Sequence, residues 1–195
     1  DDMMEKALAK RSNAGEYERN IYASYVFGKF LSEFETKCKG VMFQFSIGAE
    51  PLPYETGSKL KTETIFELAN ILNAHKNMNF QAMLANAHQN QGICTVAREC
   101  PNLSVAGYWW HNFFPSFMSK IIEERLDMLP LNKQIGFFSD AYCADWMYTK
   151  SKLVKNEIAN VLNYKIQQGQ YTFEQSVEIA KCILNRTPQT LLNLK

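Results

Sequence analysis

Apolar residues along the chain follow two patterns, one typical of amphipathic helices and one typical of short buried strands. Between Glu16 and Lys39 they recur at intervals of three and four, which predicts a long helix that ends near Gly40. Short runs rich in β-branched and aromatic residues predict four strands, at 41–47, 79–84, 103–106 and 133–138. Helical spacing predicts further helices at 2–11, 62–75, 91–100, 115–129, 145–168 and 172–185. Pro115 begins the helix at 115–129, and Thr172 is the expected N-cap of the helix at 172–185.

Each predicted strand is followed by a loop and then by a helix, and the unit recurs about every 30 residues, which calls for parallel strands joined by right-handed crossovers. Four such units form either a small open sheet or half of an eight-stranded barrel. The helix before the first strand favours the barrel, because it fits a crossover helix whose own strand lies upstream. We therefore expect an α/β fold, as one domain or as the C-terminal half of a (β/α)8 barrel, with a helical lead-in at 1–40, four βα units at 41–140 and closing helices at 141–195.

Polar and aromatic residues gather after the predicted strands rather than before them. Parallel sheets bind ligands at the carboxyl ends of their strands, so this asymmetry predicts a site at that edge. In chain order the strand ends offer Ser46 and Glu50, then Asn86, His88 and Asn90, then Trp109, Trp110, His111 and Asn112, and finally Asp140 and Tyr142.

The stretch after Gly107 is the most informative of these loops. Trp109 and Trp110 offer flat apolar walls, His111 offers a titratable group, and Asn112 both donates and accepts hydrogen bonds. This combination suits a small polar ligand. Packing of both indole rings into the core is an equally good interpretation of the same residues.

Asp140 follows an apolar strand and precedes a helix, a position that suits a general base or a metal ligand. It also suits an N-cap of the following helix. His88 and His111 each fit a group that polarises a hydroxyl or carbonyl, a metal ligand, or a loop histidine bonded to backbone. Glu50 is either a second carboxylate of the site or a solvated side chain, and no pair of histidines stands at metal-binding spacing.

Composition narrows the function class and the compartment. The formal net charge of +1, without a long basic run, argues against sequence-independent nucleic-acid binding. No apolar stretch is long enough to span a membrane, and the acidic first residues do not form a secretory signal. The five cysteines are dispersed and lack a C-x-x-C pair, so we expect reduced, mostly buried thiols in a cytoplasmic protein and no structural zinc site.

Three segments carry a resemblance to a known family: Phe45-Ser-Ile-Gly48, Ala106-Gly-Tyr-Trp-Trp-His-Asn112 and Gly136-Phe-Phe-Ser-Asp140. With the closing helices, they resemble the C-terminal half of the uronate isomerase (glucuronate isomerase) family, of the amidohydrolase superfamily, over about residues 16–190. The resemblance implies a distorted (β/α)8 TIM-like barrel. The double tryptophan and the asparagine of the family match Trp109, Trp110 and Asn112, and the aspartate after its last strand matches Asp140.

The chain departs from the family pattern at two positions. Ser46 stands where the family usually has a histidine, and Tyr142 stands where it has an arginine that recognises the sugar acid. The superfamily's His-x-His motif belongs to the first barrel strand, upstream of this chain. The resemblance therefore implies a divergent branch, with only the C-terminal half of the barrel present.

The resemblance implies aldose–ketose isomerisation of a hexuronate, of the D-glucuronate to D-fructuronate type, in carbohydrate catabolism. Asp140 is then the base or a metal ligand beside it, with its pKa raised by Phe137, Phe138 and Trp146. The substrate-binding residues are Trp109, Trp110, His111, Asn112, Tyr142, Ser46 and His88. No cofactor is certain, and a divalent metal such as zinc belongs to the complete barrel.

The implied partners are a sugar acid and either the missing N-terminal barrel half or a second copy of the chain, with neither nucleic acid nor membrane. This chain alone is expected to be inactive. The alternative is an amidohydrolase-like barrel that binds a sugar or sugar acid without catalysis, or that catalyses a different reaction.

Overall fold

The structure is a computed structural model that describes residues 2–51, 58–60 and 64–194. The chain divides into two compact units, Asp1–Gly40 and Val41–Lys195. Most of the predicted loop at 49–57 and the first residues of the predicted helix at 62–75 lie outside the described residues. In the described part of the chain, no helix combines the length and the apolar character needed to cross a bilayer.

The first unit is helical. It contains α1 (Asp2–Ala9), the 3₁₀ turn η1 (Arg11–Asn13) and α2 (Glu16–Lys37). The predicted long helix is confirmed, and it ends slightly before Gly40, whose φ of 76° suits glycine at a helix end.

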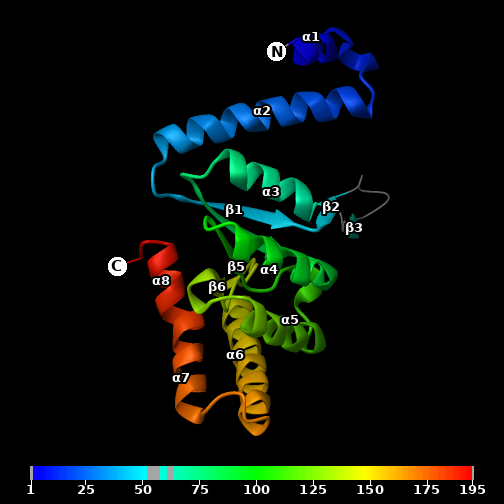
Figure 1. Cartoon of the computed structure of the whole chain (residues 1–195). Coiled ribbons are helices and arrows are strands. Elements are labelled where there is room, and N and C mark those ends of the chain that lie inside the picture. Colours follow the sequence, from blue (N-terminus) through cyan, green and yellow to red (C-terminus); the bar gives the residue numbers. More distant parts are fainter. Residues whose placement is uncertain (1, 52–57, 61–63, 195) are drawn as a thin grey trace. The chain divides into compact units, whose positions relative to one another are not determined.

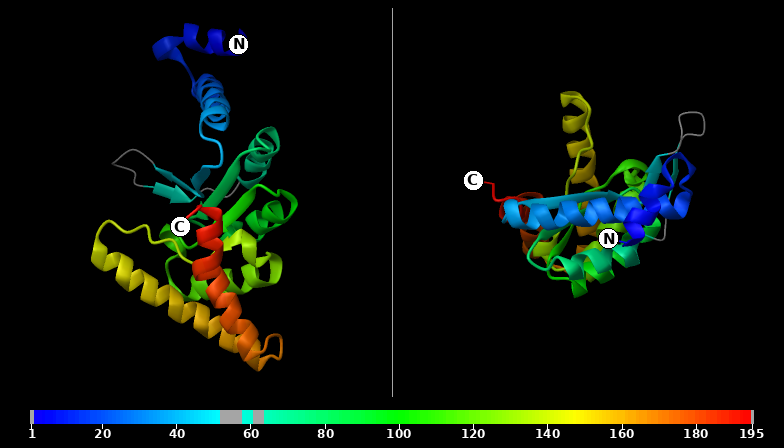
Figure 2. Two further views of the ribbon diagram at one scale, coloured as in Figure 1. Left: turned by 90° about the vertical axis from the view of Figure 1, so that its left-hand side faces the viewer. Right: turned by 90° about the horizontal axis from the view of Figure 1, so that it is seen from above.

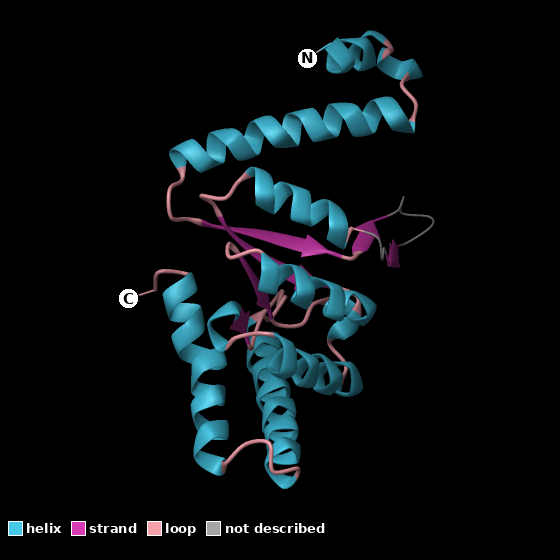
Figure 3. Ribbon diagram, in the orientation of Figure 1, coloured by secondary structure: helices cyan, strands magenta, loops and turns pink. Residues whose placement is uncertain are grey.

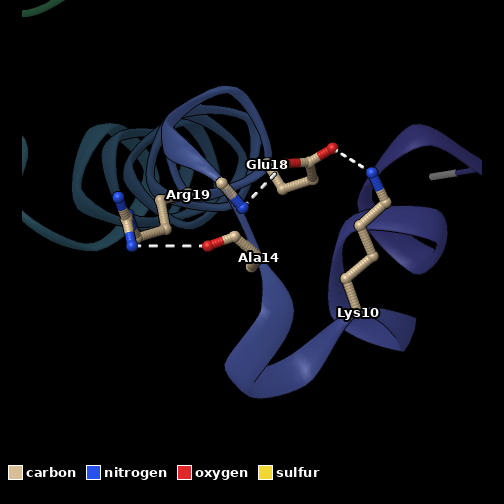
Figure 4. Close-up of polar contacts among 5 residues, drawn as sticks. Lys10, Ala14, Glu18 and Arg19 are labelled. Carbon is tan, nitrogen blue, oxygen red and sulfur yellow. Dashed lines mark hydrogen bonds and ion pairs between the residues drawn. The ribbon is translucent and has the colours of Figure 1, made fainter.

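Polar contacts fix the turn between α1 and α2 (Figure 4). The Glu18 carboxylate accepts a hydrogen bond from the Gly15 amide at 2.9 Å and forms an ion pair with Lys10. Arg19 donates a hydrogen bond to the carbonyl of Ala14 at 3.3 Å. The hydrogen bond from Lys10 lowers the pKa of Glu18. A carboxylate in the first turn also interacts favourably with the positive end of the helix dipole. Glu18 therefore stabilises the start of α2 both through its hydrogen bond to Gly15 and through its charge.

The second unit is built on a parallel four-stranded sheet with the order β1-β4-β5-β6. Its strands are β1 (Met42–Ile47), β4 (Asn79–Leu84), β5 (Leu103–Ala106) and β6 (Gln134–Ile135). The crossover helices α3 (Ile65–Ala74), α4 (Asn90–Glu99) and α5 (Pro115–Met128) lie along one side of it (Figures 1 and 3). The predicted α/β class with parallel βα units is therefore confirmed.

The two faces of the sheet differ in chemistry. One face is largely apolar, and it includes the buried residues Phe80, Leu84 and Val105. The other carries Met83, Ala106 and Ile135 near the carboxyl edge, packed against the C-terminal residues Leu191 and Leu192. Further back on that face lie the buried polar side chains of Gln81 and Ser104, where the exposed Gln44 donates to the side-chain oxygen of Gln81 at 2.8 Å and Ser104 donates to the Phe80 carbonyl at 3.2 Å.

The C-terminal segment forms α6 (Ala144–Gln167), α7 (Phe173–Lys181), the π-helical turn η5 (Cys182–Arg186) and α8 (Thr187–Leu191). Figure 2 shows α6 and α7 joined at one end and diverging at an angle, and residues of α5, α6 and α7 share a core that includes Met118, Val154 and Ile179. The predicted N-cap of α7 is confirmed: Thr172 accepts from the Gln175 amide at 3.2 Å, and the Gln175 side chain accepts from the Thr172 amide at 2.8 Å.

The prediction of a strand over 133–138 is wrong for most of its length, because only Gln134–Ile135 pair with β5. The preceding residues form a 3₁₀ turn, η4 (Leu131–Lys133), and Gly136 donates its amide to the Ile183 carbonyl at 2.7 Å instead of continuing the ladder. That carbonyl is available because the Thr187 amide bonds to Cys182, and Pro188, the next donor in a π-helix, has no N–H.

Two further predictions need correction. The segment after Gly48 is not only a loop, since β2 (Ala49–Pro51) pairs antiparallel with β3 (Ser58–Leu60). The closing helix does not stop at 185, because η5 and α8 continue the helical path to Leu191.

Gly107 ends β5 at a place where no side chain fits. Its φ is +38°, and a Cβ there would lie 2.3 Å from the backbone nitrogen of Phe138 and 2.4 Å from its Cβ. The Gly107 amide meanwhile donates to the Ile135 carbonyl at 2.8 Å. The loop after β6 therefore crosses directly over the end of β5.

We predict that Gly107→Ala lowers the free energy of unfolding by about 3 kcal/mol or more, from left-handed strain and the clash with Phe138. Gly92→Ala is the matched control. A Cβ at Gly92, inside α4, meets only Ile65 at 3.5 Å, so alanine is expected to leave stability unchanged or raise it by up to about 1 kcal/mol. Urea unfolding of both variants measures this, and equal effects would contradict the close approach at Gly107.

Candidate functional site

The ends of β4, β5 and β6 meet at one edge of the sheet, as parallel pairing requires. The loop after β5 contains the 3₁₀ turn η3 (Trp110–Asn112), and the loop after β6 runs through Phe138 and Asp140 to α6. We use the name strand-end cluster for Trp109, Asn112, Phe113, Asp140 and Lys150. These residues come from the loop after β5, the loop after β6 and α6, and their contacts bring them to this edge.

Asn112 ties the loop after β5 to the end of β4. Its side chain is 1% exposed and donates to the Leu84 carbonyl at 2.7 Å, while its amide donates to the Trp109 carbonyl at 3.1 Å. Its side-chain oxygen is buried and accepts no hydrogen bond from the described residues. Asn112 is therefore a buried residue that positions the loop after β5 against the end of β4.

The two tryptophans divide between the two roles that the sequence allows. Trp109 is half-buried and packs with Phe138 against the cluster of Met83, Ala106 and Ile135. Trp110 is 37% exposed, with its ring centroid 5.7 Å from that of Trp109 and tilted by 59°. Trp109 thus belongs largely to the core, whereas Trp110 presents an aromatic surface beside it.

Asp140 is half-buried in the loop after β6. The N-cap interpretation of this residue is wrong, because α6 begins with Cys143 as its N-cap. Asp140 has a φ of +43° and Trp110 has a φ of +51°, both costly for residues other than glycine. Such strain is typical of residues that the surrounding structure holds in place for a function.

Lys150, from the second turn of α6, links the two loops. Its ammonium donates to the carbonyls of Ser139 and Asp140, at 2.8 and 3.0 Å. It lies 4.6 Å from the ring centroid of Phe113 and 5.4 Å from that of Trp146. The sequence interpretation missed Lys150, because α6 carries several lysines and nothing in their spacing distinguishes this one.

The remaining predicted residues lie apart from these contacts. Ser46 is exposed on β1 and pairs in register with Met83, and His88 is exposed in η2 (Ala87–Gln89), where its amide donates to Asn86 at 3.0 Å. Tyr142 is 86% exposed and contacts the Trp146 ring at 5.9 Å. His111 lies within η3, and its side chain is outside the described residues.

A buried cation supports the end of β5. Arg125 of α5 is 3% exposed, donates to the carbonyl of Gly107 and to the side-chain oxygen of Asn90, both at 2.9 Å, and lies over the Tyr108 ring. Asn90 in turn donates to Glu124 at 2.7 Å. Burial lowers the pKa of Arg125, and a guanidinium nonetheless stays charged at neutral pH.

Among the described residues, no group of three histidine, cysteine, aspartate or glutamate side chains is placed to hold a metal ion. Asp140 is the carboxylate of the strand-end cluster, and a catalytic metal needs about three protein ligands, so the metal that the family resemblance implies would need ligands from the rest of the barrel.

The thiols are free in the structure, and Cys94 and Cys100 are buried. Cys38 and Cys182 are half-buried and Cys143 is exposed, so the expectation of mostly buried cysteines holds for two of the five.

Comparison with solved structures gives a clear relationship at the level of fold. Uronate isomerase from Thermotoga maritima superposes with a TM-score of 0.83 over 98% of this chain at 18% identity. Glucuronate isomerase from Caulobacter crescentus gives a TM-score of 0.85 over 100% of the chain at 12% identity, and uronate isomerase from Bacillus halodurans gives 0.72 over 85% at 19%. The fold is that of the uronate isomerases.

The chain spans less than half of each of these proteins, covering 46%, 44% and 41% of their lengths. No protein-family model and no curated protein sequence matches it.

We predict that Arg125→Met lowers the free energy of unfolding by about 2–4 kcal/mol, because it leaves the Gly107 carbonyl and the Asn90 side chain buried without their donor. Arg98→Met, an exposed arginine on the neighbouring α4, is the control and is expected to stay within about 0.5 kcal/mol. Chemical denaturation measures both, and a neutral Arg125→Met would show that the guanidinium does not support β5.

We also predict that stability falls as pH rises from about 9 to 12. Burial raises the pKa of the Cys94 thiol to about 11 from 9.0, and that of the Tyr108 phenol to about 12 from 10.0. The unfolded chain therefore releases these protons at lower pH than the folded chain, which favours unfolding as pH increases. Tyr108→Phe should flatten the decline in unfolding free energy between pH 9 and 11, and an unchanged slope would contradict this assignment.

Proposed function

We propose that this chain forms the C-terminal half of a uronate isomerase-like barrel, and that its strand-end cluster binds a sugar acid for aldose–ketose isomerisation. The observation that carries the proposal is the fold likeness to uronate and glucuronate isomerases over 85–100% of the chain. The placement of Trp109, Asn112 and Asp140 at the carboxyl edge supports it, because these residues match the motifs of the family.

The sheet itself supports the half-barrel interpretation. In the described part of the chain, β1 pairs only with β4 and β6 pairs only with β5, so the sheet has two edges. Edge strands invite pairing with further strands, and closure into a barrel removes both edges. The other barrel half, or a second copy of this chain, is the partner that we propose for them.

Isomerisation of an open-chain aldose to a ketose moves two protons and leaves the overall oxidation state of the sugar unchanged. We assign to the Asp140 carboxylate the removal of the proton from C2, which places the electron pair in an enediolate over C1 and C2. The Asp140 carboxyl group then protonates C1, with the proton taken from C2 or with one exchanged from solvent, while the hydroxyl proton passes from O2 to O1. An equivalent hydride shift from C2 to C1 gives the same product, and in that case Asp140 moves only the hydroxyl proton.

The surrounding residues suit such a substrate. Trp110 offers an exposed aromatic face against the apolar face of a sugar, and the half-buried position of Asp140 lowers the access of water to the carboxylate. The backbone at both residues is strained, which requires that the surrounding contacts hold these groups in fixed positions.

A second candidate function is binding of a sugar acid without turnover. It is favoured by the exposed position of Tyr142, which stands where the family has its arginine, and by the lack of a group of three metal-ligating side chains among the described residues. In that case, the substrate is retained and no proton is moved.

We predict that Asp140→Asn slows isomerisation at least about 100-fold, because an amide cannot act as a general base. The readouts are the formation of ketose from D-glucuronate and the exchange of deuterium from C2 into solvent, which only the proton-transfer route produces. Asp145→Asn, an exposed carboxylate in the first turn of α6, is the control and should leave the rate unchanged.

Native mass spectrometry should accompany the assay, because it shows whether a second polypeptide or a second copy completes the barrel. Full activity in the Asp140→Asn variant would contradict the assignment of the base. Sugar-acid binding without ketose formation would support the second function, and a folded chain that binds no sugar acid would contradict both.

A further inference from the structure

Lys150 is a cation that the fold places at the carboxyl edge, and its role there goes beyond the residues assigned so far. Its ammonium contacts the loop after β5 through the Phe113 ring, and it contacts the loop after β6 through the carbonyls of Ser139 and Asp140. It therefore lies between Phe113 and the loop that carries Asp140.

The charge of this ammonium is not neutralised by its contacts. Both hydrogen bonds go to backbone carbonyls, which carry no net charge, and no carboxylate of the described residues forms an ion pair with it. The Asp140 carboxylate is nearby in sequence, and yet it is the carbonyl of Asp140 that accepts the bond.

An ammonium has three donors, and the two carbonyls occupy two of them. The rings of Phe113 and Trp146 flank the group and displace water from its sides, which strengthens its attraction for an anion. The third N–H is thus available to a charged acceptor at the edge where the sugar acid is proposed to bind.

Arg125, the other cation near the ends of these strands, does not compete for this role. It is 3% exposed and already donates to Gly107 and Asn90 beneath the edge. A carboxylate on a ligand would meet Lys150 first.

We propose that Lys150 recognises the carboxylate of the substrate and makes the site selective for sugar acids over neutral sugars. The proposal rests on the proposed function, since it names the part of the substrate that distinguishes a hexuronate from a hexose. Lys150 also holds the loop of Asp140, so that carboxylate binding and the position of the base depend on one side chain.

D-Glucuronate and D-glucose provide a matched pair of probes, because they differ only in the carboxylate or hydroxymethyl group at C6. Titration calorimetry of the full chain, with any partner that copurifies, should give tighter binding of glucuronate. Lys150→Met should weaken glucuronate binding about tenfold or more and weaken glucose binding far less, because glucose loses only the support of the Asp140 loop and no carboxylate contact, whereas Lys150→Arg should retain the preference. Lys152→Met, an exposed lysine on the same helix, is the control and should not alter either affinity.

Several results would overturn the inference while the proposed function stands. These are equal affinity of the unmodified chain for the two sugars, an unchanged glucuronate affinity in Lys150→Met, and an equal loss for both sugars, which would indicate a purely structural role. If Lys150→Met does not fold, the salt dependence of sugar binding by the unmodified chain tests the proposal instead. The preference for glucuronate over glucose should shrink as ionic strength rises. A preference that salt leaves unchanged would overturn the proposal. Failure of the unmodified chain to bind either sugar would instead reject the proposed function itself.

Discussion

The loop after β6 crosses the end of β5 at a distance that leaves room for a hydrogen atom and nothing larger at Gly107. This close approach decides where the loops of two neighbouring strands go. Because Phe138 lies over Gly107, it packs with Trp109 on the cluster of Met83, Ala106 and Ile135, and Asp140 follows two residues later at the same edge. A side chain at position 107 would push these two loops apart. It would thereby separate Trp109 from Asp140.

Polar contacts from two helices hold this crossing in place from opposite sides. Arg125 of α5 bonds to the Gly107 carbonyl from the interior, and Lys150 of α6 bonds to the carbonyls of Ser139 and Asp140 from the surface. The positive φ angles at Trp110 and Asp140 cost free energy that local sequence cannot supply, and tertiary contacts of this kind supply it. The same residues thus serve stability and the geometry of the candidate site.

Sequence reasoning predicted the elements whose causes are local. The parallel βα order, the proline at the first position of α5 and the cap at Thr172 all follow from residues close to the feature they explain. It missed what depends on distant residues. The early end of β6 depends on Pro188, about 50 residues away in the chain. Lys150 differs from the other lysines of α6 through its contacts with two loops that lie outside the helix. Tyr142 and Asp140 both follow the fourth predicted strand, and both were expected at the site. Tyr142 is exposed to solvent, whereas Asp140 is half-buried.

The π-helical turn at Cys182–Arg186 makes the length of the C-terminal segment as important as its composition. Each residue of a helix turns the following chain by about 100° about the helix axis. Removal of one residue from the regular helix α7 would rotate the following residues by that angle, so that Leu191 and Leu192 would face away from Met83, Ala106 and Ile135. Substitutions in this segment leave that orientation intact, whereas a single insertion or deletion does not. Variation among natural or designed relatives is therefore expected to conserve the residue count between Gly136 and Leu192 more strictly than the residues themselves.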